Sequence, residues 1–421
     1  MVGWLVVAGS RVVVSGVRGS RRSAVEANAV LRRAAGRGVR DLAVVFDAPT
    51  GCGCGSDLPG VGRGVGVGGV AVDSIDDMRV LFAGVSFGRV STVLAADAVA
   101  APLLLLYQLV AEERGVPARW LAGGVGNDPL RGFVVRGVGL FPPGLSVRLA
   151  GDVLCYCAAE LPRWVSAGLS GCELAGAGAS AAQEVAFTAA DGLAYVRAAV
   201  AGGLDAGVAV SRLSFVFAAG ATVVEGAAKV LAARRVWARL VAREFGERVA
   251  VSCGARFGTC SLGAGGGWGV SRAVLRVRSA VGLCAVERLA GEVAGAAFGL
   301  VERVEQAGGV WGAAGGGFRG AGRARGGRGY GCGRGAGGGV GQVERLAKVR
   351  AWRCGERVAG ALRAVGVVAE GGGNVLFPMK EALAAGATVG EVCGVLRGVW
   401  GSGGAECGWC GTGDGVGCGG F

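Results

Sequence analysis

The residues best placed to do chemistry follow a short apolar run, in the segment FDAPTGCGCGSDLPG at 46–60. The run at 44–46 is β-prone, and the aspartate, proline and glycine that follow it end a strand. Parallel α/β folds carry their reactive groups in such loops, beyond the carboxyl ends of the strands. This loop offers only the thiols of Cys52 and Cys54 among glycines, so few of its side chains can catalyse a reaction.

Cysteine and histidine usage argues against several kinds of site. The 14 cysteines include CGC at 52–54 and CYC at 155–157, neither of which has the spacing of metal ligands. CGWC at 407–410 has CxxC spacing, but no second pair accompanies it, so we expect neither zinc nor redox chemistry there. The 421 residues contain no histidine, which removes the usual acid–base group at neutral pH and the commonest metal ligand.

The charge balance raises nucleic-acid binding as an alternative. The formal net charge is +13, and arginine supplies nearly all of the positive charge. A basic chain can bind phosphates, and FRGAGRARGGRGYGCGRG at 318–335 has the composition of an arginine–glycine RNA-binding segment. The excess of Gly, Ala, Val and Arg, whose codons are GC-rich, produces the same charge without any partner. We therefore expect no nucleic-acid partner.

Alternating strand-like and helix-like segments must position these loops. From about residue 24 to 283, β-prone runs alternate with helical patterns, which is typical of a parallel sheet with crossover helices. The expected strands lie at 40–49, 90–96, 121–129, 164–171, 211–220 and 249–259, and the expected helices at 100–115, 146–164, 180–204, 226–246 and 270–283. The simplest arrangement is a β/α barrel, although only about six strand–helix units are present where closure needs about eight.

A series of collinear motifs runs through the chain. It includes FDAPT with GSDLP at 46–59, GVAVDSIDDMRVLFAG at 69–84 and GNDPLRGFVVRGVGLFPP at 126–143. Further motifs lie at 105–116, 156–164, 177–198, 212–217 and 387–401. Together, over roughly residues 20–400, they resemble the methylmalonyl-CoA mutase family in its large, catalytic chain.

The resemblance implies an α/β fold, an incomplete TIM-type β/α barrel followed by a small helical region. It implies adenosylcobalamin as cofactor and a radical isomerisation that interconverts methylmalonyl-CoA and succinyl-CoA, with an acyl-CoA as substrate. These residues contain no cobalamin-binding domain and no histidine to ligate cobalt. The cofactor would therefore need a separate cobalamin-binding small subunit, or none is bound; a second mutase chain is the other expected partner.

The expected organisation has five segments. They are an N-terminal extension at 1–23, the acyl-CoA mutase barrel at 24–310, a Gly/Arg-rich segment at 311–342, a helical region at 343–401 and a disordered tail at 402–421. The last part of the family's barrel is missing near 281–285. No basic region of a signal peptide begins the chain, and the apolar stretch at 98–111 is too short to span a bilayer. We expect a cytoplasmic protein without membrane contact.

The resemblance also assigns active-site positions, most of which carry replaced residues. Cys54 and Gly126 stand where the family has a tyrosine and a glutamine, and Cys172 with Glu173 replaces a tyrosine–histidine pair. Gly258, at a cofactor-binding position, replaces another histidine, while Arg136 matches the arginine that pairs with the substrate carboxylate. Glu173 accepts hydrogen bonds where the family's histidine donates one to the thioester carbonyl.

Two functions follow as expectations. The first is a mutase large chain whose activity is impaired or lost, and the alternative is a non-catalytic structural subunit that pairs with a competent mutase chain. Each site residue also has a purely structural interpretation. Cys54 and Cys172 are then small buried apolar residues, Glu173 is a solvated loop carboxylate and Arg136 lies on the surface.

Overall fold

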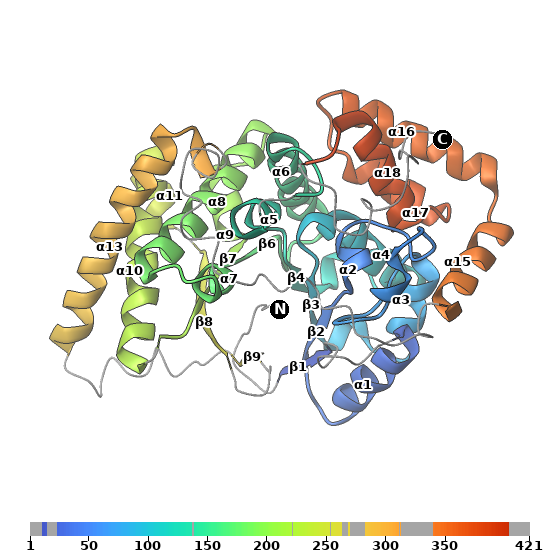
Figure 1. Ribbon diagram of the computed structural model, residues 1–421, viewed down its shortest axis with the longest axis horizontal. Helices are drawn as coiled ribbons and strands as arrows, with labels where there is room; N and C mark the ends of the chain where they lie inside the picture. Colours follow the sequence, from blue (N-terminus) through green and yellow to red (C-terminus); the bar gives the residue numbers. More distant parts are fainter. Residues whose placement is uncertain are drawn as a thin grey trace.

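Parallel strands flanked by helices form the molecule (Figure 1). The computed structural model describes residues 11–14, 23–136, 139–220, 222–252, 254–262, 268–269, 283–310, 312 and 340–403. The strands are β1 (Arg11–Val14), β2 (Asp41–Val45), β3 (Ser91–Ala95), β4 (Ala122–Val125), β5 (Trp164–Val165), β6 (Ala167–Ser170), β7 (Leu213–Ala218), β8 (Arg256–Leu262) and β9 (Trp268–Gly269). This mixed α/β architecture confirms the predicted fold class.

The strands follow one another in chain order around an open barrel. One sheet has the order β1-β2-β3-β4-β5 and the other β6-β7-β8-β9, and every pair is parallel except β8 with β9. Only Ser166 separates β5 from β6, so the two sheets meet at an interrupted strand. Among the described residues, β1 pairs with β2 alone and β8 with β7 and β9, which leaves the barrel open between β1 and β8.

Helices cover the outer faces of both sheets. The α-helices are α1 (Ala24–Gly36), α2 (Ala48–Gly51), α3 (Ile75–Leu81), α4 (Ala100–Glu113), α5 (Pro129–Arg136), α6 (Pro143–Glu160), α7 (Cys172–Gly176), α8 (Ala181–Ala201), α9 (Ala206–Ser211), α10 (Val223–Phe245), α11 (Glu247–Val251), α13 (Leu283–Gln306), α15 (Val340–Trp352), α16 (Gly355–Glu370), α17 (Leu376–Ala384) and α18 (Val389–Trp400). Short 3₁₀ turns are η1 (Val61–Arg63), η2 (Phe87–Arg89), η3 (Asp97–Val99) and η4 (Ala118–Trp120). None of the described helices is long and apolar enough to cross a membrane.

Several sequence expectations are confirmed at the level of single elements, and others differ. The long helix expected from Ser180 begins there, because Ser180 and Gln183 form a capping box at the N-terminus of α8. The strand expected at 249–259 instead starts at Arg256, after the short helix α11. The first strand, β1, lies inside the segment expected as an N-terminal extension. The helix expected at 270–283 and most of the Gly/Arg-rich segment lie outside the described residues.

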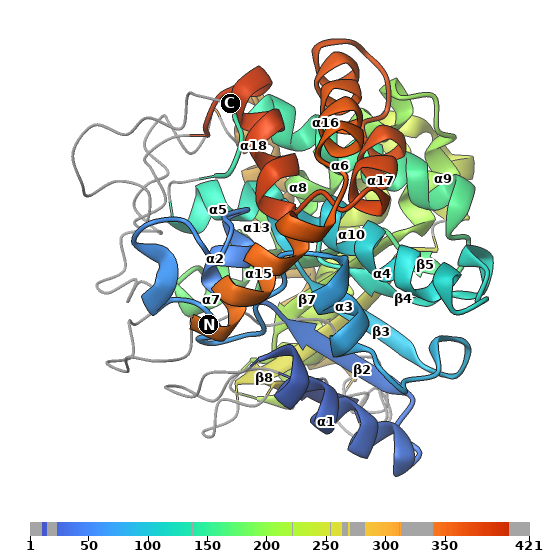
Figure 2. The same cartoon turned by 90° about the vertical axis from the view of Figure 1, so that its right-hand side faces the viewer.

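The four C-terminal helices pack back onto the first sheet's side of the barrel. Figure 2 shows α15–α18 running over α3, α4 and α6, and α17 contacts both α4 and α6. Gln342 of α15 donates to the buried Asp73 carboxylate at 2.7 Å, and the Val389 amide of α18 donates to the Asp73 carbonyl at 2.8 Å. The DSIDD motif is therefore one of the points at which the helical region attaches to the barrel, along with contacts such as Asn374 to the Asp152 carbonyl and Lys380 to Glu112.

The interior of the barrel is lined by small apolar side chains. One buried cluster joins residues from both sheets. It contains Ala43 and Val45 of β2, Val93 and Ala95 of β3, Val216 and Ala218 of β7, and Cys172 of α7. The two sheets thus contact one another across the inside of the barrel. Their carboxyl ends all face the same rim, where the loops that could carry a functional site begin.

Candidate functional site

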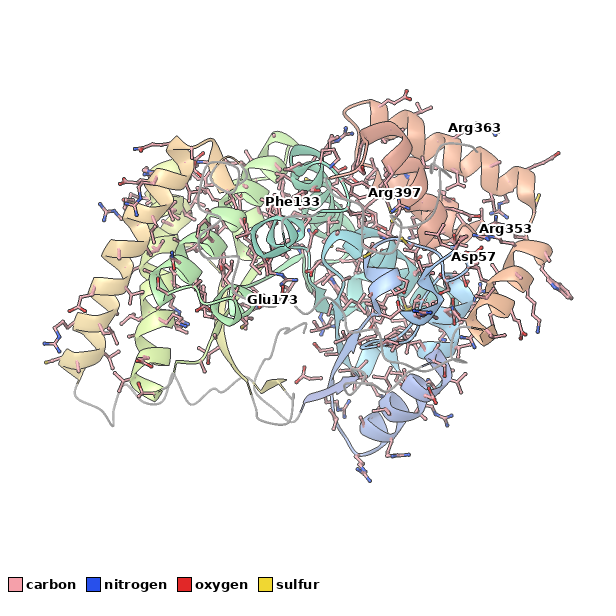
Figure 3. The ribbon with its side chains drawn as sticks, viewed as in Figure 1. Asp57, Phe133, Glu173, Arg353, Arg363 and Arg397 are labelled. Carbon is pink, nitrogen blue, oxygen red and sulfur yellow. The ribbon has the colours of Figure 1, made fainter. Side chains whose placement is uncertain are left out.

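Charged groups gather where three neighbouring strands end. Asp97 follows β3, Asp128 and Arg131 follow β4, and Glu173 follows β6. Figure 3 shows Glu173 on α7 near the middle of the molecule, with α5 and its Phe133 beside it. The rim of an open β/α barrel is where this fold carries its chemistry, so this cluster is the candidate site.

Arg131 is the centre of the cluster. Its side chain is only 1% exposed, and it forms ion pairs with Asp97 and with Glu173, whose Oε2 lies 3.3 Å from Arg131 Nε. The Asp97 and Glu173 side chains are 24% and 10% exposed, so the two carboxylates cover the guanidinium on the side that faces solvent. The Arg131 guanidinium is thus paired within the chain, in the kind of charge-assisted contact that arginine commonly forms with carboxylates.

Asp97 adopts an unusual backbone conformation at this point. Its φ is +35°, and it is the one non-glycine residue of the described chain with positive φ. Such conformations cost free energy and persist where surrounding contacts hold them, commonly at functional sites. Here the ion pair with the buried Arg131 supplies such a contact.

Buried polar groups next to this cluster hold the start of α5 in place. The Tyr195 hydroxyl of α8 donates to Asp128 Oδ1 at 2.8 Å and accepts from the Leu130 amide at 3.0 Å, which fixes the start of α5. Burial raises the pKa of Asp128, although the Arg131 charge and the Tyr195 hydrogen bond act in the opposite direction. Burial and the nearby Asp128 raise the pKa of Asp191 well above its usual range. Burial therefore disfavours the charged form of both carboxyl groups near Arg131.

A separate buried ion pair lies at the carboxyl end of β7. Lys229 Nζ of α10 is 2.6 Å from Glu184 Oε2 of α8 and donates to the Ala218 carbonyl at 2.9 Å. Glu184 Oε1 accepts from the Ala218 amide at 2.6 Å. Burial raises the Glu184 pKa, and the Lys229 charge opposes that shift. Because every partner is internal, this pair holds two helices on a strand.

The structure brings two of the predicted site residues to the rim cluster. Cys172 and Glu173 form the first turn of α7, with Cys172 buried against the barrel interior and Glu173 against Arg131. Glu173 is therefore not the solvated loop carboxylate of the structural interpretation. Its place in an ion pair comes from a partner on another element, Arg131 of α5.

The Cys54 loop is packed by its own side chains and is held by Arg397 of α18, which donates to the Cys52 and Gly53 carbonyls. Cys54 is buried in a small cluster with Val61, Val65 and Ala71, and its thiol donates to the Cys52 carbonyl at 3.6 Å. Asp47 lies between the end of β2 and this loop. Its carboxylate caps α2 and accepts hydrogen bonds from the Thr50 and Gly66 amides at 2.9 and 2.6 Å. Burial raises the pKa of Asp47 to about 6. These contacts order the loop without turning a reactive group to the rim.

The remaining predicted positions carry little or no described side chain. Gly126 is buried directly after β4, where its amide donates to the Leu94 carbonyl at 2.8 Å. Gly258 lies within β8 opposite Val216 of β7. Arg136 ends α5, and its side chain lies outside the described residues. Its role as a carboxylate ligand stays a prediction.

The described residues do not fit the role of a cobalt ligand. The whole sequence lacks histidine, the commonest metal ligand, so this chain offers no imidazole to cobalt. Cys54 and Gly126 also present no large side chain that could pack against a macrocycle. The charged centre of the rim is Arg131, which is paired with Asp97 and Glu173.

Sequence reasoning missed Arg131 and Asp97. Both lie in quoted or neighbouring segments, but their partners are distant in sequence: 34 residues separate the two members of the ion pair. The sequence carries one usable signal, since Asp97 and Arg131 each follow an expected strand by a few residues. Residues in that position meet at one rim of a parallel barrel.

Comparison with known proteins gives one family. The model of the family described as methylmalonyl-CoA mutase matches residues 19–264 and 339–402. The methylmalonyl-CoA mutase large subunit of Propionibacterium freudenreichii subsp. shermanii is 42% identical over 226 residues, which are 54% of this chain and 31% of the relative. Methylmalonyl-CoA mutase of Rhizobium meliloti (strain 1021) is 41% identical over 219 residues, 52% of this chain and 31% of the relative.

A eukaryotic relative matches to a similar degree. The probable mitochondrial methylmalonyl-CoA mutase of Caenorhabditis elegans is 39% identical over 211 residues, 50% of this chain and 28% of the relative. The aligned part of this chain thus spans about a third of the length of these curated relatives.

Proposed function

This chain belongs to the methylmalonyl-CoA mutase family, and from that premise we propose that it is a barrel-bearing mutase chain with strongly impaired turnover. Its substrate class is an acyl-CoA, and its cofactor by descent is adenosylcobalamin, supplied by a separate cobalamin-binding subunit. The observation that carries the impairment is Glu173, which replaces a hydrogen-bond donor and is paired with Arg131. A missing preorganised donor typically costs about 10²–10³ in rate.

The other replaced positions lower the expected rate further. Cys54 is packed within its own loop, and Gly126 contributes only a backbone amide, which is used by Leu94. Neither can orient a substrate or exclude water as a large side chain would. We assign no reaction step through the cofactor, because this chain has no histidine to offer cobalt and the separate subunit would hold the cofactor.

The test is a turnover assay on the purified full chain. The chain is mixed with adenosylcobalamin and the cobalamin-binding small subunit of a relative, and succinyl-CoA formation from methylmalonyl-CoA is followed beside a competent mutase. We expect a rate at least about 10³-fold below the competent enzyme, since more than one donor is missing. A rate within tenfold of that enzyme contradicts the proposal.

A structural subunit is the second candidate, favoured by one observation. The family resemblance predicts replaced side chains at the rim, and the C-terminal helices dock on the barrel through Asp73, Gln342 and Val389. Retained docking without retained chemistry is what a non-catalytic partner would need. Co-expression with a tagged, competent mutase chain checks it: a stoichiometric complex supports this role, and failure to co-purify excludes it.

A further inference from the structure

The arrangement around Arg131 has the composition of an occupied anion site. The guanidinium is buried, its Nη2 contacts Asp97 Oδ2, and its Nε lies 3.3 Å from Glu173 Oε2. Guanidinium groups that bind ligands use the same N–H donors to pair with an external carboxylate or phosphate. In this chain the two carboxylates that satisfy it come from the ends of β3 and β6.

The two covering carboxylates differ in how they are held. Asp97 belongs to the short turn η3 and has φ of +35°, so its backbone is constrained at the strand end. Glu173 lies in the first turn of α7 and reaches Arg131 through a longer side chain. Removing the Glu173 side chain removes one carboxylate and leaves the space that it filled beside Arg131. The backbone of α7 and the Asp97 carboxylate remain in place.

The other carboxyl groups near Arg131 balance its charge only in part, so the Glu173 carboxylate is needed as a counter-ion. The charges of Asp128 and Asp191 also interact with Arg131, but burial raises the pKa of both carboxyl groups. Burial thus disfavours their charged form, whereas Asp97 and Glu173 keep some side-chain exposure. Glu173 and Asp97 are the covering groups with side-chain exposure, so they are the ones an incoming anion could replace.

We propose that Arg131 forms a carboxylate-binding site at the barrel rim which the chain fills with its own Glu173, so that an external carboxylate binds there only when that side chain is removed or displaced. In the native chain the filled site turns away ligands that carry a carboxylate at the rim. The site takes a small carboxylate such as formate or acetate, or the carboxylate of a larger ligand. Carboxylate binding at Arg131 requires neither an acyl-CoA nor a cofactor, so this proposal is tested independently of the proposed function.

The test is rescue of a truncated side chain by an added carboxylate. The Glu173→Ala full chain is compared with the native chain by thermal unfolding in sodium formate, sodium acetate and sodium chloride at equal ionic strength, and in acetamide. We expect formate and acetate to raise the variant's Tm by on the order of 2 °C above chloride. Acetamide should have no effect, and the native chain should respond equally to all three salts.

Two control variants make the result specific. Glu292→Ala removes an exposed carboxylate on α13 and should show no preference for formate. Glu173→Ala combined with Arg131→Met should lose the formate response, because the guanidinium is gone. Saturation-transfer NMR with ¹³C-formate adds a direct readout, with a signal expected for Glu173→Ala and none for the native chain.

The outcomes against the proposal are equally definite. An equal response of Glu173→Ala to formate and chloride, or a formate response that survives Arg131→Met, overturns it. If Glu173→Ala does not fold in chloride, the readout becomes the yield of folded chain in formate relative to chloride. An unchanged yield then counts against the site, and a yield raised by formate but not by acetamide supports it.

Discussion

Buried carboxyl groups are the residues whose free energy depends most strongly on conditions. Asp47 and Asp152 lie on different elements, yet burial raises the pKa of each to about 6. Asp47 is held by two backbone amides within its own loop, whereas Asp152 on α6 accepts from the Val375 amide at 3.2 Å. Each group binds its proton more tightly in the folded chain than in the unfolded chain, which links folding to pH.

The first prediction is that the chain loses stability as pH rises from 5 to 7.5. For each of Asp47 and Asp152 the folded pKa of about 6 exceeds the ordinary 3.8, so the stabilisation present at low pH is lost as pH rises through 6. That loss is about 1.4 kcal/mol per group over this interval. Urea titrations at both pH values measure it.

Asp152→Asn provides the check on this assignment. Asparagine keeps an oxygen for the Val375 amide but does not ionise, so about half of the pH-dependent loss should disappear. Asp205→Asn serves as the control, because Asp205 caps the short surface helix α9. A pH dependence that is unchanged in Asp152→Asn contradicts the prediction.

At the scale of elements, Lys229 and Glu184 show how a few polar contacts join helices to a strand. The pair links α10 to α8, and both residues also bond the backbone of Ala218 at the end of β7. A buried ion pair adds little net stability compared with apolar residues, but loss of one partner leaves an uncompensated charge. The pair therefore fixes where these elements meet.

We predict that Lys229→Met lowers the free energy of unfolding by about 3–5 kcal/mol. Adding Glu184→Gln should recover much of this loss, because glutamine can still accept from the Ala218 amide without a charge. Lys348→Met, the same change at an exposed position of α15, should stay within about 0.5 kcal/mol of the native chain. Equal effects at positions 229 and 348 would rule out this role for the pair.

A close helix contact gives the next prediction. A Cβ on Gly151 of α6 would lie 2.8 Å from the Ala198 Cβ of α8, whereas a Cβ on Gly144 of the same helix would meet nothing within 4 Å. We expect Gly151→Ala to destabilise the chain by about 1–3 kcal/mol through overpacking. Gly144→Ala should be neutral or slightly stabilising. Chemical denaturation of both variants measures the difference, and similar values would show that α6 and α8 can separate at little cost.

Local sequence patterns predicted most elements but not the contacts between them. Apolar runs and the helical pattern from Ser180 predicted β2, β3, β7 and α8, because these signals lie within the elements themselves. The site cluster could not be predicted in the same way, since Arg131 belongs to it through ion pairs with Asp97 and Glu173, which lie on other elements. The sequence places RVVV at 11–14 in an N-terminal extension, but in the structure this run pairs with β2 as the first strand.

For the whole molecule, the question is whether two cores unfold as one. The larger cluster joins the first sheet and α4 to the C-terminal helices, and the second joins β6 and β7 to α8, α10 and α13. Helix α6 belongs to both, since Leu149 and Val153 enter the first cluster and Ala150 and Leu154 the second. The small cluster inside the barrel is a second bridge between the sheets.

We therefore predict a single cooperative unfolding transition for the full chain in urea. Far-UV circular dichroism reports helices of both clusters, while tryptophan fluorescence reports Trp164 and Trp400 in the first and Trp237 in the second. Coincident curves are expected because neither core can lose α6 without exposing apolar side chains of the other. Gly151→Ala, which pushes α6 from α8, should separate the curves if α6 carries this coupling. Two transitions in the native chain would instead mean that the open barrel behaves as two independently stable halves.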